Sequence, residues 1–343
     1  MGYYLIGSFF HDIYVMLIFF RKDLGEVPIM YKKHRRIGHF LIISSILLFS
    51  VLLVGSLFIL SGQVARNTSY HPSASIPETE IQITGISSQN AILTNVDSKI
   101  ILASKKPDER IYPASMTKLM TALTVVSNVD DIEAIIEMPE DAYRKMLAEN
   151  ASMSGFLPGE AASVKDYLYG MLLPSGGECC ICLAEYISGS EAEFVQLMNQ
   201  EALALGMQNT HFANTTGLHD ESHYSTSRDI SILLQAVVQV PLLYEMLTSH
   251  YYVVPPTNRH PEGFTMHNTI FQYLAGNDLQ SGHILGGKTG YTSKAGQCLA
   301  SIAMVDGTLY SLVTAGAYPN SDDDHANTQD ALLIYDRYPM MRP

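Results

Sequence analysis

The sequence predicts an α/β fold of the α+β kind: one antiparallel sheet built from both ends of a domain, with flanking helices and a helical subdomain inserted between the strands. Two observations predict it. β-Hairpin patterns stand near both ends of the region 81–340, and helical patterns fill the stretch between them. We therefore expect strands that lie far apart in the sequence to meet in one sheet.

The two hairpins are recognised by their turns. The first, AILTNVDSKIILA at residues 91–103, has two apolar runs on either side of a polar centre, as expected for two short strands. The second, CLASIAMVDGTLYSLVTAGA at residues 298–317, contains Asp306-Gly307 between two such runs. This dipeptide favours a tight turn between strands, so we expect the second hairpin to turn there.

Five segments between the hairpins have the periodicity of helices. Apolar residues recur every three or four positions, which gives each segment one face to bury. The segments are residues 116–126, 164–173, 178–187, 191–205 and 227–247.

The composition is that of a folded chain with unevenly placed charge. Of the 343 residues, 47% are hydrophobic and 16% are charged. The first 62 residues hold six Lys and Arg against three Asp and Glu, which leaves 15 basic and 31 acidic residues in the remainder. So acidic a remainder argues against a phosphate-binding groove, and we expect no nucleic-acid partner.

The N-terminal region has the pattern of a membrane anchor. Residues 40–60 carry no charge and are long enough to cross a hydrocarbon core of about 30 Å as a helix. The basic cluster YKKHRR precedes them, which predicts that residues 1–39 are cytoplasmic. We therefore expect a single-pass cell-membrane protein whose exported catalytic domain, 81–340, follows a polar linker, 61–80. An uncleaved or cleaved signal is the alternative, and the true start could be Met30.

Four cysteines are present: Cys179, Cys180, Cys182 and Cys298. Adjacent cysteines rarely pair with each other, and the C-C-x-C run lacks the paired C-x-x-C spacing of a zinc site. We expect buried thiols, the first three on a helix.

The segment YPASMTK, residues 112–118, places Ser115 at the start of a helix and Lys118 one turn later on the same face. A serine needs a base to become a nucleophile, and lysine can serve if desolvation or nearby positive charge lowers its pKa from about 10.4 toward 7. The N–H groups of the first helical turn can help to hold an oxyanion. The plain alternative is an N-capping serine beside an exposed lysine.

Two further motifs follow along the chain. LLPSGGE, residues 172–178, is a proline-led turn between two helices that presents Ser175. GGKTGYT, residues 286–292, places Lys288 and Thr289 on an edge strand flanked by glycines, where a substrate backbone can approach closely and a carboxylate can pair with the lysine. Alone, each has a plain alternative, namely a helix–helix turn and a glycine-rich strand entry with a solvated lysine.

Together, S-x-x-K, S-x-x and K-T-G resemble the motif set of penicillin-binding proteins and class A β-lactamases. The stretches YPASMTKLMTAL, LPGEAASVKDYLYGMLLPSG, LALGMQNTHFANTTGLHDESHYSTSRDI and GGKTGYTSKAGQCLA resemble the low-molecular-weight D-alanyl-D-alanine carboxypeptidases, over residues 85–338. The resemblance implies a β-lactamase/D,D-peptidase-like fold and a hydrolase that needs no cofactor or metal. Its substrate would be a peptidoglycan stem peptide ending in D-Ala-D-Ala, and β-lactam antibiotics would inhibit it.

The same resemblance implies the roles of three residues in the reaction. Ser115 would form the acyl-enzyme, and Lys118 would be its general base. Ser175 would relay protons to the leaving D-alanine.

Substrate binding is implied for the K-T-G strand. Lys288 and Thr289 would bind the terminal carboxylate, Gly290 would lie along the substrate, and the N–H group of Tyr291 would complete the oxyanion hole with that of the nucleophile. Gly177 stands where the family usually has a substrate-binding asparagine, so we expect Gly177→Asn to raise kcat/KM about two- to tenfold. The arginine that relatives often carry after the last strand is also missing from AGAYPNSDDDH.

Three alternatives remain at this point. His219 and His223, four residues apart, have the spacing of a zinc protease, but the glutamate does not follow the first histidine and NTTG favours a loop. A β-lactamase shares the first motif, although S-D-N and a deacylating glutamate loop are missing. A wall-binding or antibiotic-sensing relative that acylates and then stalls is made plausible by Gly177.

Overall fold

The computed structural model describes residues 80–274, 279–318 and 325–341, which belong to one compact unit, 77–343. The predicted cytoplasmic segment 1–39 and membrane helix 40–60 lie outside the described residues, as does the linker up to its last residue. Within the described part, no single helix is long and apolar enough to cross a membrane, although one sharply bent helix pair passes on length and composition.

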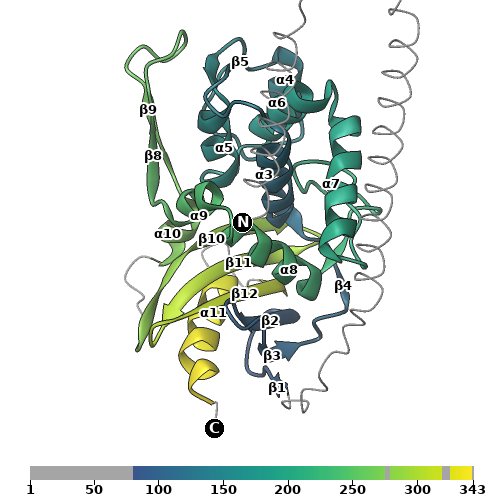
Figure 1. Cartoon of the computed structure of the whole chain (residues 1–343), viewed down its shortest axis with the longest axis vertical. Helices are drawn as coiled ribbons and strands as arrows, with labels where there is room; N and C mark the ends of the chain where they lie inside the picture. Colours follow the sequence, from purple (N-terminus) through teal and green to yellow (C-terminus); the bar gives the residue numbers. More distant parts are fainter. Residues whose placement is uncertain (1–79, 275–278, 319–324, 342–343) are drawn as a thin grey trace, which may run out of the picture. The chain divides into compact units, whose positions relative to one another are not determined.

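The main sheet has six strands in the order β1-β3-β2-β12-β11-β10 (Figure 1). The strands are β1 (Ile81–Gln82), β2 (Asn90–Asn95), β3 (Ile101–Lys105), β10 (Gly282–Thr292), β11 (Gly296–Val305) and β12 (Thr308–Ala317). All neighbours are antiparallel except β1 and β3. The two predicted hairpins, β2–β3 and β11–β12, meet where β12 pairs with β2. The prediction of one sheet built from both ends of the domain is confirmed.

The turn of the second hairpin is the one predicted. Asp306 and Gly307 both have positive φ, 47° and 75°, as the type I′ turn that suits the twist of two strands requires. β10 pairs only with β11 and is an edge strand of the sheet, which confirms the position expected for the K-T-G motif.

The helical predictions are confirmed with one exception. The matching helices are α3 (Thr117–Asn128), α5 (Val164–Leu172), α6 (Gly177–Ser188), α7 (Glu191–Leu205), α8 (Ser227–Val238) and α9 (Pro241–Thr248). The single helix expected over 227–247 is wrong, because the chain bends by 107° between α8 and α9. Pro241 has no N–H to continue a helix but suits the first turn of a new one, where it lies.

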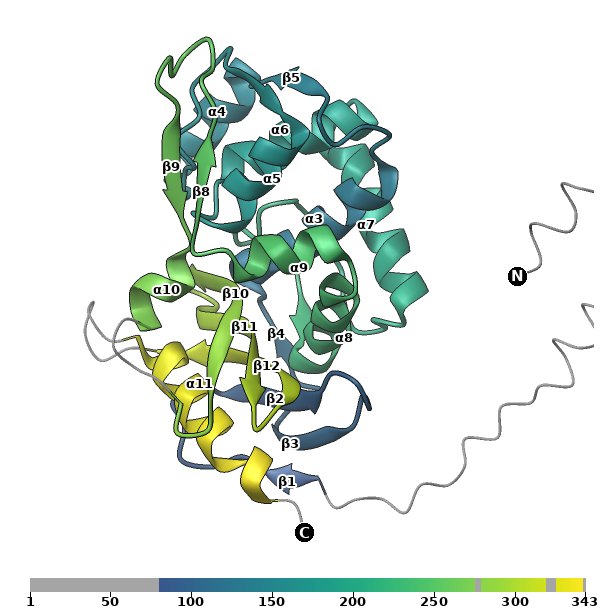
Figure 2. The same ribbon diagram turned by 60° about the vertical axis from the view of Figure 1, so that its left-hand side comes forward.

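Several short elements have no counterpart in the sequence predictions. The helical ones are α4 (Glu140–Ala148), α10 (Thr269–Leu274), α11 (Ala326–Arg337) and η3 (Pro339–Met341), whereas η2 (Ala114–Met116) leads into α3 and carries the predicted helix start at Ser115. The strands form three two-stranded sheets, β4 (Arg110–Ile111) with β7 (Ser225–Thr226), β5 (Ile135–Glu137) with β6 (Ala161–Ser163), and β8 (Tyr251–Val254) with β9 (Phe264–His267). Figure 2 shows β8 and β9 as a ribbon that extends along the helical part of the unit.

The sheet is covered on both faces. Ile92 of β2 packs into a cluster with the helices between the hairpins, whereas its neighbours Ala91 and Leu93 pack into a second cluster with α11. This alternation follows from the two-residue period of a strand. Figures 1 and 2 show α11 against the sheet and the helices α3 to α7 gathered beyond it.

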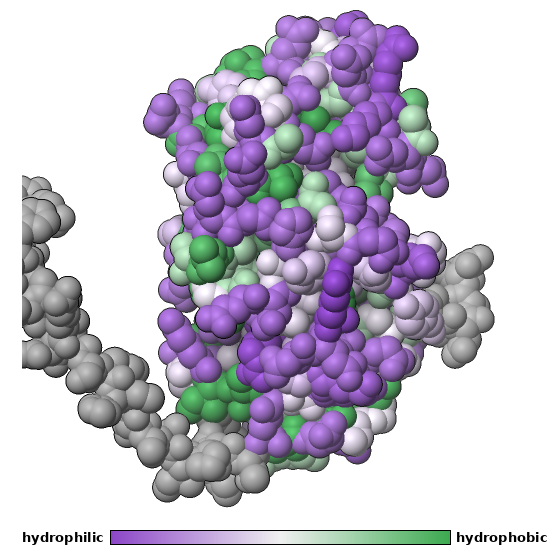
Figure 3. All heavy atoms as spheres, turned by 90° about the vertical axis from the view of Figure 1, so that its right-hand side faces the viewer, coloured by the Kyte–Doolittle hydropathy of each residue, from purple (hydrophilic) through white to green (hydrophobic). Residues whose placement is uncertain are grey.

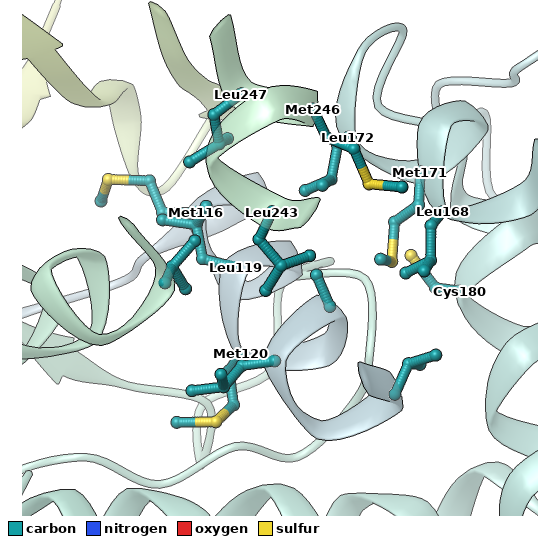
Figure 4. Packing of buried hydrophobic residues seen from close by; sticks show 14 of the residues in the cluster. Met116, Leu119, Met120, Leu168, Met171, Leu172, Cys180, Leu243, Met246 and Leu247 are labelled. Carbon is teal, nitrogen blue, oxygen red and sulfur yellow. The ribbon is translucent and has the colours of Figure 1, made fainter. Parts of the chain in front are cut away.

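Helix α3 is buried along most of its length and is held from several sides. Met116, Leu119 and Met120 lie close to leucines and methionines of α5 and α9 (Figure 4). Every residue from Thr117 to Val125 is buried. A helix packed this tightly gives the side chains at its N-terminus fixed positions.

The four cysteines lie in the interior, and the visible surface is mostly polar. Cys179, Cys180, Cys182 and Cys298 are all buried and unpaired, three on α6 and one on β11, which confirms the prediction of buried thiols. The face of the described part seen in Figure 3 is mainly hydrophilic, with apolar side chains in small separate spots.

Candidate active site

The three motifs border one cavity of about 450 Å³. It is open to solvent and lies between the edge strand β10, the start of α3 and the turn before α6. Its lining comprises Ser115, Lys118, Asn150, Ala151, Ser152, Pro174, Ser175, Thr216, Gly217, Leu218, Thr269, Tyr273, Thr289, Gly290, Tyr291, Thr292, Gln297, His325 and Asn327.

Ser115 and Lys118 are in contact, as their spacing predicts. Ser115 lies in η2, which leads directly into α3, and its Oγ is 3.0 Å from Lys118 Nζ. The lysine also donates a hydrogen bond of 2.8 Å to the carbonyl oxygen of Thr216. In the neutral amine this bond uses one N–H and leaves the lone pair free to take the serine proton.

The surroundings of Lys118 favour its neutral form. The side chain is buried, and this burial lowers its pKa below the ordinary value, while negative charge on Cys180 and Glu178 would act in the opposite direction. Desolvation disfavours a charged amine. The direction of the shift is therefore the one that a general base needs near neutral pH.

Lys288 lies behind the cavity wall and does not reach the surface. Its side chain is fully buried, and Nζ donates a 3.1 Å hydrogen bond to the carbonyl oxygen of Thr289. Burial, and then the charge of Lys118, hold the pKa of Lys288 well below its usual range. Thr289 and Gly290 of this motif do line the cavity, and the hydroxyl of Thr289 lies 2.7 Å from the hydroxyl of Thr269.

Ser175 occupies an unusual backbone conformation in the turn between α5 and α6. Its φ is +70°, a region that non-glycine residues rarely adopt and that concentrates at functional sites. Its Oγ borders the cavity and is buried without a hydrogen-bond partner among the described residues. A hydroxyl held in this way can donate to or accept from a bound molecule.

The strand β10 runs close beside the nucleophile. A Cβ atom added at Gly290 would lie only 2.9 Å from the backbone nitrogen of Ser115, so a side chain here would force the strand away. The glycine thus brings the next residue, Tyr291, beside the serine at the edge of the cavity. Its side chain is exposed, and its backbone is the part available to the site.

Gly177 does not line the cavity. Its N–H donates a 2.8 Å hydrogen bond to the carbonyl oxygen of Ser152, and a Cβ atom there would meet Met146 Sδ at 2.8 Å and Ala151 Cβ at 3.4 Å. A side chain at this position therefore starts toward Met146. The substrate contact expected of residue 177 finds no support in this placement.

This geometry changes the result expected for Gly177→Asn. We expect no gain in kcat/KM and a loss of about 1 to 3 kcal/mol in the free energy of unfolding, because the asparagine must displace the methionine. Urea unfolding of the parent, the variant and the double variant with Met146→Ala measures this. A tenfold gain in kcat/KM for the single variant would show instead that the amide does reach the substrate.

The second histidine of the HDESH segment, His223, is hydrogen-bonded within the protein. His223 is buried, with Nε2 2.8 Å from Thr117 Oγ1 and Nδ1 accepting the Ala213 N–H at 3.1 Å. Burial lowers its pKa to about 4. Both ring nitrogens are therefore occupied, and no cluster of three metal-binding side chains occurs in the part of the chain that the structure describes.

Sequence reasoning missed the residues that close the far end of the cavity. Tyr273 of α10 stacks on His325, with ring centroids 3.9 Å apart, and Gln297 and Asn327 lie beside them in the lining. None of them belongs to the S-x-x-K, S-x-x or K-T-G motifs. The one available signal was Asn268-Thr269, a polar pair at the start of a short apolar run, which is typical of a helix N-terminus.

A serine that opens a buried helix beside a desolvated lysine, with a second serine and a glycine-flanked edge strand around the same cavity, defines the class of serine enzymes that act through an acyl intermediate. The family model for D-alanyl-D-alanine carboxypeptidase matches residues 76–318. The chain belongs to this family.

Curated relatives agree with this assignment. The chain is 35% identical over 219 residues to the D-alanyl-D-alanine carboxypeptidase DacF of Bacillus subtilis, covering 63% of this chain and 54% of the relative. It is 32% identical over 276 residues to DacC of Escherichia coli, covering 78% and 65%. The chain thus spans between half and two thirds of the length of these relatives.

Solved structures share the fold. The DD-transpeptidase of Streptomyces K15 superposes with a TM-score of 0.66 at 24% identity, over 74% of this chain and 98% of that one. A penicillin-binding protein homolog from Mycobacterium tuberculosis gives 0.65 at 21% identity, over 78% and 97%. The predicted D,D-peptidase-like fold is confirmed.

Proposed function

We propose that this protein is a serine-type D-alanyl-D-alanine carboxypeptidase that removes the terminal D-Ala from peptidoglycan stem peptides. The observation that carries the proposal is the 3.0 Å contact between Ser115 Oγ and the buried Lys118 Nζ, inside a cavity bordered by the K-T-G strand. Membership of the carboxypeptidase family supports the same activity.

Acylation follows from this geometry. Neutral Lys118 takes the proton of Ser115 as Oγ attacks the carbonyl carbon of the penultimate D-Ala. Negative charge that develops on the carbonyl oxygen is stabilised by the backbone N–H groups of Ser115 and Tyr291. The C–N bond breaks, and the proton that Lys118 took from Ser115 passes through the hydroxyl of Ser175 to the nitrogen of the leaving D-alanine, so that Lys118 is neutral again and the acyl group stays on Ser115. Water then hydrolyses the ester and restores the serine.

The K-T-G strand supplies the other contacts. A substrate peptide laid along the exposed edge of β10 pairs its backbone with the strand, as peptides do at open sheet edges. The hydroxyl of Thr289 then meets the terminal carboxylate. Lys288 is buried behind this strand, close to Lys118. A positive charge on one of the two lysines disfavours a positive charge on the other.

Incubation with a synthetic peptide ending in D-Ala-D-Ala tests the proposal. Mass analysis should show loss of one D-alanine with the parent and none with Ser115→Ala. A parent that labels with penicillin but releases no D-alanine would support the stalled, sensing alternative instead. Steady hydrolysis of nitrocefin would support a β-lactamase.

We also propose that residues 40–60 anchor the protein in the cell membrane with the catalytic domain outside the cytoplasm. The uncharged stretch and the basic cluster before it support this. β-Lactam antibiotics would then reach the site without crossing the membrane.

A truncated chain beginning at Gln63 is expected to stay in solution without detergent and to label with penicillin as the full chain does, because every described residue that lines the cavity lies after residue 63. Sedimentation after high-speed centrifugation, compared between the full and truncated chains, measures this. A full chain that remains in the supernatant would contradict the anchor, and a folded truncated chain that loses labelling would contradict a catalytic domain separable from it.

A further inference from the structure

Glu178 is a buried carboxylic acid that the mechanism above does not use. It lies in the first turn of α6, directly after the turn that carries Ser175, and its side chain is fully buried. Its Oε1 accepts hydrogen bonds from both the N–H of Ser154, at 2.6 Å, and the Ser154 hydroxyl. Its Oε2 is buried without a hydrogen-bond partner among the described residues.

Burying such a group is costly, so its contacts must offset the cost. Burial raises the pKa of Glu178, and the two hydrogen bonds from Ser154 act in the opposite direction. A well-packed apolar residue would avoid this conflict. An acid at this position is therefore useful mainly for its two hydrogen bonds from Ser154.

The partner segment is one wall of the active-site cavity. Asn150, Ala151 and Ser152 line the cavity, and Ser154 follows them. The same wall touches the Ser175 turn at two more places. Gly177 N–H donates to the carbonyl oxygen of Ser152 at 2.8 Å, and a Cβ at Gly176 would lie 2.7 Å from Ser154 Cβ.

The wall and the Ser175 turn are therefore packed and hydrogen-bonded together. Glu178 supplies two of the side-chain contacts between them, and the Ser154 hydroxyl also lies 3.1 Å from Cys179 Sγ on the same helix. Ser175 depends on these neighbours for its position, because its φ of +70° is unfavourable and its own hydroxyl has no hydrogen-bond partner among the described residues. A strained backbone persists only when its surroundings determine it.

We propose that Glu178 is a positioning residue: through its paired hydrogen bonds to Ser154 it fixes the Asn150–Ser154 wall against the following turn, and so holds the hydroxyl of Ser175 where it serves the reaction. This inference rests on the proposed function, since it assigns Ser175 a part in acylation. Glutamine could replace the acid, because its amide oxygen accepts the same two bonds. Alanine could not.

A double-mutant cycle tests the inference. The rate constant for acylation by benzylpenicillin is measured for Glu178→Ala and Glu178→Gln, each with Ser175 present and with Ser175→Ala, and each variant is melted. With Ser175 present, we expect Glu178→Ala to slow acylation about tenfold to a hundredfold, as a displacement of about 1 Å can. Glu178→Gln should stay within about twofold of the parent, the size of ordinary additivity errors.

In the Ser175→Ala background, Glu178→Ala should slow acylation no further, although it lowers Tm as before. Glu185→Ala, on the same helix but away from the cavity, is the matched control and should leave the rate unchanged. If Glu178→Ala does not fold, Ser154→Ala, which removes one of the two bonds, should give a smaller loss of rate with the same dependence on Ser175.

An equal loss in both backgrounds would overturn the inference, because it would show an effect that does not pass through Ser175. An acylation rate equal to that of the parent, in either the Glu178→Ala or the Ser175→Ala single variant, would also overturn the inference. A parent that benzylpenicillin does not acylate would instead overturn the proposed function, and the inference with it.

Discussion

Ser115→Ala is expected to abolish both the release of D-alanine and covalent labelling by a fluorescent penicillin. The hydroxyl of Ser115 is the atom that forms the ester, and alanine leaves nothing in its place. Loss of a nucleophile of this kind lowers turnover by at least about 10⁴-fold. Labelling on a denaturing gel and peptide turnover, at equal folded fraction, measure the two losses.

Ser98→Ala is a suitable control for this variant, because Ser98 is an exposed turn residue between β2 and β3. It should label and turn over peptide as the parent does. If Ser115→Ala labels as strongly as the parent while it melts like the parent, another residue is the nucleophile and the site has been misassigned.

Lys118→Arg is expected to slow acylation by about 10² to 10⁴-fold, the usual effect of removing a positioned base. Arginine is always charged and does not give up its proton in proteins, so it cannot take the proton of Ser115. Lys118→Met removes the amine but keeps a side chain of similar length. It tests the same role if the larger arginine disturbs the buried site. Acylation by benzylpenicillin, followed by intact mass, gives the rates.

The pH profile of the parent provides the second part of this prediction. Only neutral Lys118 can take the serine proton, so the rate must rise as pH rises through its pKa, which burial places below the ordinary value. Acylation should therefore already be efficient near neutral pH. Lys294→Arg, at an exposed position on the loop after β10, should leave the profile unchanged. A parent rate that is independent of pH across the acidic and neutral range would contradict the role of the lysine.

Local patterns were enough to predict the contact between Ser115 and Lys118. Their three-residue spacing at the start of an apolar helix places both side chains on one face, within reach of each other. The same holds for the hairpin turn at Asp306-Gly307, where the backbone needs positive φ at both residues. These predictions depend on a few neighbouring residues, and the structure agrees with them.

Features set by distant segments could not be predicted in this way. The helix pattern over 227–247 hid a bend at Pro241, because the apolar face continues on both sides of it. The burial of Lys288 depends on strands and helices from other parts of the chain. A side chain at residue 177 would meet Met146 of α4, a helix that was not predicted from the sequence.

The far end of the cavity shows the same limit. His325 and Tyr273 stack across a long gap in sequence, and neither belongs to a recognisable motif. Glu178 directly follows the S-x-x triplet of residues 175–177, yet its partner Ser154 lies on a loop whose path only the structure shows. Contacts between such distant segments can be identified only in the folded structure.

The central claim is that Ser115 carries the acyl group. Its most direct test is to quench the parent protein with acid shortly after mixing with benzylpenicillin, digest it, and locate the adduct by tandem mass spectrometry. We expect one adduct per chain, on Ser115, in the peptide that continues into Lys118. An adduct on Ser175 or any other residue, or a folded protein that carries none, would contradict the account.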